Sequence, residues 1–139
     1  MTTDLFTLYE TDTLDLSRFL MESKRIRHIP IVDSEDNFRG LLTHRDLLRV
    51  SVSSLADVDP DTKRDLLKAI PVREVMKASI TTVDPFLDLE EAAGMMLDHK
   101  FGCLPVVNEG KLVGILTEAD FVKLTISLLK FAKENLSEE

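Results

Sequence analysis

Cysteine and long apolar runs are scarce in this sequence, and each shortage excludes a class of protein. The single cysteine, Cys103, excludes a scaffold held together by disulfides. No stretch approaches the roughly 20 apolar residues that a membrane span needs. With five glycines, five prolines, 44% hydrophobic and 30% charged residues, the composition excludes a collagen-like or disordered chain. The N-terminus lacks the basic start and apolar run of a signal peptide, so we expect a cytoplasmic location.

Basic residues are also in deficit, because 17 Lys and Arg face 25 Asp and Glu and the net charge is -8. Such a chain repels a nucleic-acid backbone or an anionic membrane, so we expect neither as a partner. An anionic ligand would need a local basic cluster, and residues 24–28 (Lys-Arg-Ile-Arg-His) supply one. The same run is equally compatible with a solvated helix end, where cations complement the helix dipole.

The 139 residues suffice for one domain with a core, and they contain one unit twice. Residues 14–32 and 89–107 read alike, and each runs through a turn into a near-identical motif. The motif is Gly-Leu-Leu-Thr-His-Arg-Asp at 40–46 and Gly-Ile-Leu-Thr-Glu-Ala-Asp at 114–120. The number of residues between the two copies is too large for the common solenoid repeats, so we expect two units related by a pseudo-twofold axis.

The periodicity within each unit predicts strand, helix, strand, strand and helix. The predicted fold class is therefore α/β (α+β), with two β-α-β-β-α units packed as one module. The first helices are predicted from Leu16, Phe19, Leu20 and Ser23 and from Leu89, Ala92, Ala93 and Met96, the strands at 29–32, 39–42, 104–107 and 111–116, and the last helices from about His44 and over 118–135.

Residues 51–71 are predicted to connect the two units, with a short helix over 62–69. Leu55, Leu66, Leu67 and Ile70 indicate that this connector packs on the module. The second unit has a lead-in at 72–76 that the first lacks, so we expect a trimmed chain or a protein that extends upstream. The predicted organisation is unit one at 1–50, the connector at 51–71, unit two at 72–128, and a helix end with an acidic tail at 129–139.

In both units the last strand runs into a helix through Thr-x-x-Asp, at Thr43–Asp46 and Thr117–Asp120. This spacing is close to a capping box, which satisfies free N–H groups at a helix start. Because Asp is shorter than Glu or Gln, we expect it to reach back less well and to leave its carboxylate freer. A carboxylate can accept from both hydroxyls of a ribose diol, and the duplication of the motif favours such a ligand role. Gly40 and Gly114, just before the motifs, predict close approach of a neighbour or ligand.

The element order, the strand prolines Pro30 and Pro105 and both motifs together resemble a tandem pair of cystathionine β-synthase (CBS) domains. The match covers roughly residues 3–50 and 72–128, and the chain looks most like small free-standing bacterial CBS-pair proteins of the acetoin-utilisation type. The resemblance implies a regulatory module that senses an adenosine-containing ligand in clefts between the units. AMP, ADP, ATP or S-adenosylmethionine would be a regulatory ligand rather than a cofactor.

The resemblance also assigns roles to particular residues. It implies that Asp46 and Asp120 hold the ribose hydroxyls, with Thr43 and Thr117 near ribose or phosphate. Unit one is basic where phosphate would be handled, and unit two has Gly102, Glu118 and Ala119 there, so a phosphorylated ligand is expected to prefer one site. The implied base pocket comprises Thr7, Leu8 and His28 in unit one and Thr82, Val83 and Cys103 in unit two, and the basic residues of unit one are Arg27, His28, His44 and Arg45.

Two alternatives stay open: a structural dimerisation module without a ligand, and a regulatory fragment of a larger protein. The intact Thr and Asp of both motifs argue against loss of ligand binding. An enzyme is not expected, because the sequence offers no nucleophile–base pair, P-loop or metal cluster. His28, His44 and His99 lack metal-site spacing, so no metal is predicted. Cys103 is interpreted as a small buried residue rather than a reactive thiol.

We also predict a homodimer, because the helices carry more apolar surface than so thin a module can bury. The apolar stripe of the last helix is interpreted mainly as core, with part left for a partner. The residues of this prediction are Ala92, Ala93, Met95 and Met96, and those of the stripe are Phe121, Leu124, Ile126, Leu128, Leu129 and Phe131.

Overall fold

The computed structural model describes residues 5–55 and 57–137. The chain forms two compact units, one of residues 6–81 with 109–112 and one of residues 82–108 with 113–137. Each unit combines helices with short strands, which confirms the predicted mixed α/β fold class.

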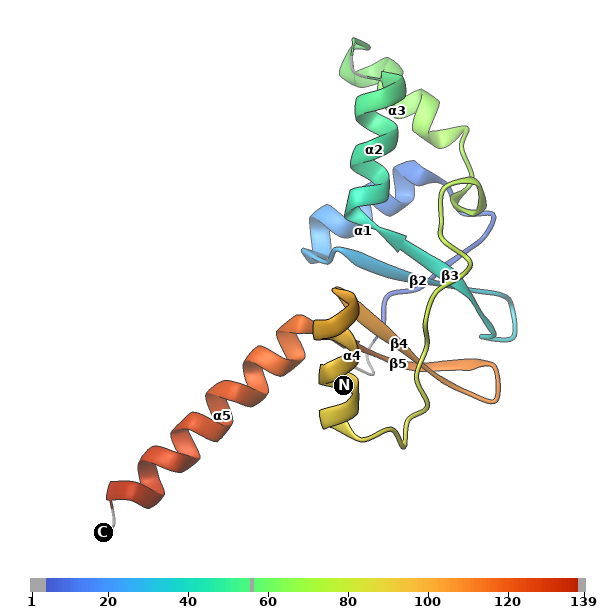
Figure 1. Ribbon diagram of the computed structural model, residues 1–139. Helices are drawn as coiled ribbons and strands as arrows, with labels where there is room; N and C mark the ends of the chain where they lie inside the picture. The colour runs from blue at the N-terminus through green and yellow to red at the C-terminus, as the bar shows by residue number, and fades with distance from the viewer. Residues whose placement is uncertain (1–4, 56, 138–139) are drawn as a thin grey trace. The chain divides into compact units, whose positions relative to one another are not determined.

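The unit of residues 6–81 is built around a three-stranded sheet (Figure 1). Its elements are β1 (Leu8–Tyr9), α1 (Leu14–Lys24), β2 (His28–Val32), β3 (Phe38–Thr43), α2 (His44–Leu55), α3 (Pro60–Lys68) and the 3₁₀ turn η1 (Val72–Glu74). The sheet order is β1-β2-β3, with β1 parallel and β3 antiparallel to β2. Helix α3 confirms the helix predicted in the connector and begins two residues earlier, because Asp59 accepts a hydrogen bond from the Thr62 N–H and caps the helix there.

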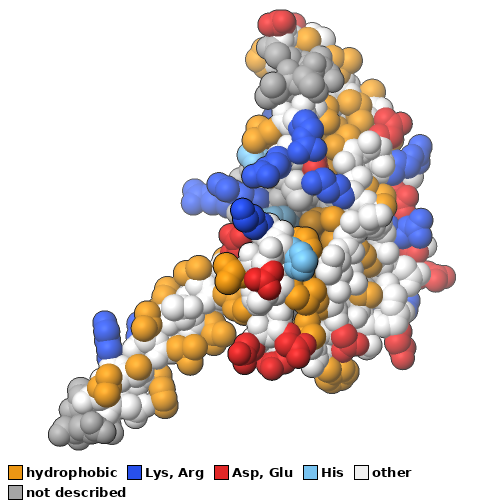
Figure 2. All heavy atoms as spheres, viewed as in Figure 1, with side chains coloured by type: hydrophobic (Ala, Val, Ile, Leu, Met, Phe, Trp, Pro, Cys, Tyr) orange, Lys and Arg blue, Asp and Glu red, His pale blue; other side chains and the backbone are white. Residues whose placement is uncertain are grey.

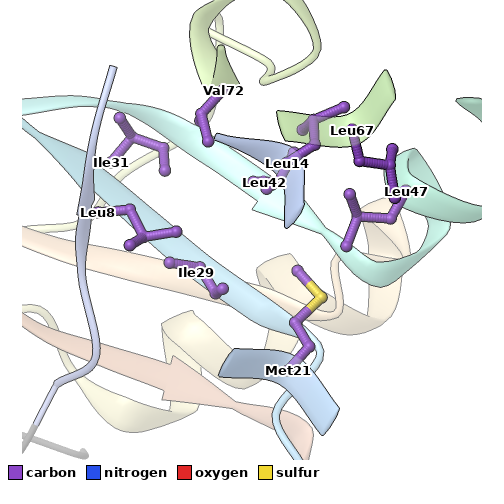
Figure 3. Packing of buried hydrophobic residues seen from close by; sticks show 9 residues of the cluster. All are labelled: Leu8, Leu14, Met21, Ile29, Ile31, Leu42, Leu47, Leu67 and Val72. Atoms are coloured by element: carbon purple, nitrogen blue, oxygen red, sulfur yellow. The ribbon is translucent and has the colours of Figure 1, made fainter. Parts of the chain in front are cut away.

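The core of this unit joins the sheet to its helices, as Figure 3 shows. Ile29 and Leu42 from the sheet and Leu14 from α1 have no exposed surface. Leu67 and Val72 pack into the same cluster, and Ile70 lies against it. The connector therefore packs on this unit as predicted, although the Leu55 side chain lies outside the described residues.

Helix α1 buries a different face from the one that its apolar spacing suggested. The buried positions are Leu14, Ser17 and Met21, whereas Leu16 and Phe19 are 42% and 63% exposed. The helix start explains the difference. Thr13 caps α1 and accepts a hydrogen bond from the Leu16 N–H at 3.2 Å, so the first helical residue, Leu14, turns toward the sheet. Positions three and seven residues later then share its face.

The unit of residues 82–137 contains α4 (Leu89–His99), β4 (Cys103–Asn108), β5 (Lys111–Thr117) and α5 (Glu118–Ser137). The predicted first strand is reduced to a single parallel bridge between Val83 and Val106. Pro85 follows closely and has no N–H to donate, so it cannot extend the pairing. The core of this unit comprises Val83, Ala92, Met96, Leu104, Val106 and Leu116.

The sequence repeat is reproduced in local structure. Helices α1 and α4 both have 11 residues, and each ends in a left-handed residue, Arg25 (φ 54°) or Lys100 (φ 57°). The N–H of each of these residues donates to the carbonyl four residues earlier, on Met21 or Met96. The parallel pairing of Leu8 with Ile31 likewise has its counterpart in Val83 with Val106.

Helix α5 departs from the prediction that its apolar stripe is core. Phe121 is half-buried against the core of its unit, but every described side chain from Val122 to Leu136 is exposed. Figure 1 shows the reason, because α5 runs on beyond α4, β4 and β5 of the same unit. Among the described residues, no helix combines the length and apolarity needed to cross a bilayer.

Candidate ligand site

The first motif lies where β3 ends and α2 begins. The Thr43 N–H donates to Asp46 Oδ2 at 2.9 Å, and the Asp46 N–H donates to Thr43 Oγ1 at 3.1 Å. The expectation that the aspartate reaches back less well is therefore wrong. Asp46 is the third residue of α2, where even a short carboxylate reaches the N–H of the residue that precedes the helix.

The second motif repeats this arrangement between β5 and α5. The Thr117 N–H donates to Asp120 Oδ2 at 2.9 Å, and Thr117 Oγ1 donates to the same oxygen at 3.2 Å. In both motifs one carboxylate oxygen accepts the threonine N–H, which orients the whole carboxylate at the start of the helix.

Asp46 is only 3% exposed and has a cation beside it. Lys77 Nζ lies 3.8 Å from Asp46 Oδ1, and the Lys77 side chain is half-exposed. The backbone brings Lys77 there, because Leu41 and Lys77 exchange two N–H···O bonds of 2.9 Å. The sequence alone did not indicate Lys77 as a site residue, although it directly follows the lead-in at 72–76. The pairing joins residues 36 positions apart, and no local pattern signals it.

Gly40 permits this close approach. A Cβ added at Gly40 would lie 2.7 Å from the Lys77 carbonyl oxygen and 3.1 Å from Met76 Sδ. The prediction that this glycine lets the strand pass close to a neighbour is confirmed, and the neighbour is a segment of the same unit.

The structure places several of the predicted site residues of unit one beside the motif. His28 lies directly opposite Thr43 in the pairing of β2 with β3. The His44 N–H donates to the Arg27 carbonyl at 2.8 Å, which joins the start of α2 to the segment before β2. Leu8 does not share this position: it is buried in β1 and pairs with Ile31, three residues along β2 from His28, and Thr7 is exposed just before it.

The corresponding residues of the second unit occupy equivalent local positions. The Glu118 N–H faces the Gly102 carbonyl at 3.4 Å, as His44 faces Arg27. Cys103 begins β4 as His28 begins β2. Its thiol is buried as predicted, and burial raises its pKa to about 12. Val83 is buried and Thr82 exposed, like Leu8 and Thr7.

The basic residues predicted to handle phosphate do not all share one surface. Arg27 and His44 line an open groove of about 990 Å³ bounded by α1, α2 and α3. His28 and Arg45 are not among its lining residues, and Arg45 is exposed in the first turn of α2. Among the described residues, no group of three His, Cys, Asp or Glu side chains could hold a metal ion.

Comparison with known proteins supports the repeat and its motifs. The family model for the CBS domain matches residues 1–53 and 72–127. A CBS domain-containing protein from Dictyostelium discoideum is 30% identical over 94% of this chain and 90% of its own length. Two other curated relatives are longer, and the chain spans 24% and 40% of their length.

Solved structures agree with this match. A protein from Vibrio cholerae assigned to acetoin utilization (AcuB) is 42% identical, with a TM-score of 0.82 over 96% of this chain and 92% of that one. The structure of CBSX2 in complex with AMP is 29% identical, with a TM-score of 0.76 over 90% of each chain. With two matched segments, two copies of the motif and this structural likeness, the chain belongs to the CBS domain family, as a tandem pair.

Proposed function

We propose that this CBS pair is a regulatory module that binds an adenosine-containing ligand through its two motifs. The observation that carries the proposal is the local geometry that Thr43–Asp46 and Thr117–Asp120 share. In each motif the threonine N–H holds the aspartate carboxylate at the start of its own helix. The AMP complex of CBSX2, a relative at 29% identity, supports an adenine nucleotide as the ligand. AMP, ADP, ATP and S-adenosylmethionine all carry the ribose that the carboxylates would recognise.

The motif chemistry suits a ribose diol. One oxygen of each carboxylate accepts a backbone N–H, and a carboxylate retains further lone pairs for neighbouring hydroxyls. At Asp46, Oδ1 is 3.8 Å from Lys77 Nζ, so a bound diol would share that oxygen with the ammonium. The adenine would lie against Thr7, Leu8 and His28 at one motif, and against Thr82, Val83 and Cys103 at the other.

Calorimetric titration tests the proposal, preceded by a thermal-shift screen of AMP, ADP, ATP, GTP, S-adenosylmethionine and NADH. A ligand that binds only the folded chain raises its melting temperature. We expect Asp46→Ala with Asp120→Ala to weaken binding of the best ligand at least tenfold. Unchanged titration of this double variant would refute the ribose assignment.

Two matched controls separate ligand binding from helix capping. Asp59 caps α3 and Asp88 caps α4, so Asp59→Ala and Asp88→Ala each remove a capping carboxylate away from the motifs. Both controls should bind the ligand like the wild type. If the controls lose as much affinity as the motif variants, the effect comes from helix stability rather than from ligand contact.

A second observation favours assembly into a homodimer. Between Val122 and Leu136, α5 exposes seven large apolar side chains by 40–69%. Most helical stability in proteins comes from packing of an apolar face, and exposed apolar patches of this kind mark interfaces. A twofold dimer is the commonest way to cover one. Of the α4 residues predicted to contribute, Ala92 and Met96 are instead buried within their own unit.

Light scattering on the full chain tests the dimer. We expect about twice the chain mass of 15.7 kDa at micromolar concentration, and the monomer mass for Leu128→Lys with Phe131→Lys. Lys123→Glu, a charge change on the same helix, is the control and should leave the dimer intact. A monomer mass for the wild type would contradict the proposal. A dimer that binds none of the screened ligands would favour the purely structural alternative.

A further inference from the structure

The first helices of the two repeats, α1 and α4, differ in whether another helix covers them. In the unit of residues 6–81 the chain returns after α2 as α3, which packs on α1. The Leu14 N–H donates to the Ile70 carbonyl just beyond α3 at 3.0 Å, and Leu67 of α3 shares a buried cluster with Leu14. As a result, Leu14 has no exposed surface.

The equivalent side of α4 is bare. Leu89 aligns with Leu14 in the sequence repeat, yet it is 49% exposed. Leu97 lies about two turns further along the same side of α4 and is 80% exposed, with Ala93 between them. We call Leu89, Ala93 and Leu97 the α4 stripe. No helix within the described residues 82–137 takes the place of α3 over it.

The second repeat has no α3 because α5 does not break. Leu55, the last residue of α2, and Leu129 each lie nine residues beyond the motif aspartate of their repeat. In the first repeat Asp59 and Pro60 then begin a new helix. Residues 130–137 contain neither proline nor glycine, so α5 continues past this point instead of returning to α4.

Helix α5 needs more than one neighbour to cover its apolar surface. At 3.6 residues per turn, its exposed large apolar residues spread over roughly 220° of the helix circumference, whereas a single apolar stripe spans about 100°. Pairing of two α5 helices alone would therefore leave apolar surface in water. The residues concerned are Val122, Leu124, Ile126, Leu128, Leu129, Phe131 and Leu136.

The charges of α4 and α5 are complementary. Residues 84–98 carry five acidic residues and no basic one, and residues 122–133 carry three lysines and no acidic residue. Figure 2 shows acidic side chains over α4 and apolar side chains along α5. Opposite charges favour the pairing of α4 with α5, whereas α4 against α4 or α5 against α5 would bring like charges together.

We propose that α5 of a second copy covers the α4 stripe, as α3 covers α1 within the first unit. The inference rests on the homodimer proposed above and adds the surface that receives α5. In a twofold dimer the contact occurs twice, because each copy supplies one α5 and one α4 stripe.

Light scattering on the full chain tests this surface with two matched variants. Leu89→Lys with Leu97→Lys places charge in the α4 stripe. Leu16→Lys with Phe19→Lys is the control, because these residues are 42% and 63% exposed on the equivalent helix α1. We expect the dissociation constant of the dimer to rise at least tenfold in the test variant and to change less than twofold in the control.

The outcomes separate this contact from the dimer itself. A test variant that dimerises like the wild type would overturn the α4 contact and leave the dimer standing. Equal losses in the test and control variants would also overturn the assignment to α4. A monomeric wild type would overturn both the contact and the dimer.

Disulfide cross-linking tests the same contact without added charge. Chains with Leu97→Cys are mixed and oxidised with differently tagged chains that carry Leu128→Cys, Leu129→Cys or Phe131→Cys, all at exposed positions and all with Cys103→Ala. We expect a covalent dimer of the two kinds of chain for at least one α5 position. Cross-links only between chains of the same kind, or none in any mixture, would overturn the contact.

Discussion

The two repeats share their secondary structure but differ in what surrounds their motif aspartates. Asp46 is buried and lies 3.8 Å from Lys77, and its N–H donates to the Thr43 hydroxyl. Asp120 is half-buried, and the Thr117 hydroxyl donates to its carboxylate. The four-residue motif thus orients the carboxylate in both repeats, whereas neighbours distant in sequence decide how accessible it is.

The largest expected effect concerns the glycines of the two repeats. Gly40→Ala should lower the free energy of unfolding by about 2–3 kcal/mol, because the new Cβ would lie 2.7 Å from the Lys77 carbonyl oxygen. Gly94→Ala should raise it by up to about 1 kcal/mol, because its Cβ meets nothing within 4 Å among the described residues and Ala favours the helix. Urea unfolding measures both. Equal effects of the two substitutions would contradict the close approach at Gly40.

Loss of the capping aspartate should also destabilise the two repeats to different extents. Asp46→Ala removes the carboxylate that accepts the Thr43 N–H. Because Asp46 is buried, we expect this substitution to lower the free energy of unfolding by about 1–2 kcal/mol. Asp120→Ala should cost about 0.5–1 kcal/mol, because that carboxylate is more exposed. Asparagine variants keep an acceptor oxygen and should recover part of each loss. If Asp120→Ala proves the more costly, burial does not govern the difference.

The basic residues of unit one should make ligand binding asymmetric. Arg27→Ala should weaken AMP binding about tenfold, or about 1.4 kcal/mol, and leave adenosine binding nearly unchanged. The difference should shrink in high salt, because the contact is charged. Calorimetric titration of both ligands against wild type and variant measures it. Equal losses for AMP and adenosine would mean that Arg27 does not contact phosphate.

Up to about pH 10, the smallest expected effect is that of the buried Cys103 thiol at the start of β4. Burial raises the Cys103 thiol pKa from 9.0 to about 12, so the folded state keeps this proton when the unfolded state loses it. Stability is therefore unaffected below about pH 9 and falls between about pH 9 and 12, by about 1 kcal/mol from pH 9 to 10. Cys103→Ala should remove this part of the decline in urea unfolding. A native thiol that reacts with iodoacetamide as fast at pH 9 as an unfolded one would contradict the burial.

Much of the fold was predictable, because it depends on local spacing. The strand prolines, the turns and the Thr-x-x-Asp motifs located strands and helices to within a few residues. The errors came from features that spacing does not contain. The buried face of α1 follows from the Thr13 cap, and the exposure of α5 follows from its running beyond the rest of its unit.

By itself, the sequence determined the repeat, the order of its elements and the residues of both motifs, since each is written in a short continuous segment. Only the tertiary structure decided that Lys77 lies beside Asp46 and that α3 brings Lys63 and Arg64 to the groove at α1. It also decided that Arg27 lines this groove, whereas Arg45 does not. These contacts join segments far apart in the chain, and burial and chain pairing select them rather than local propensity.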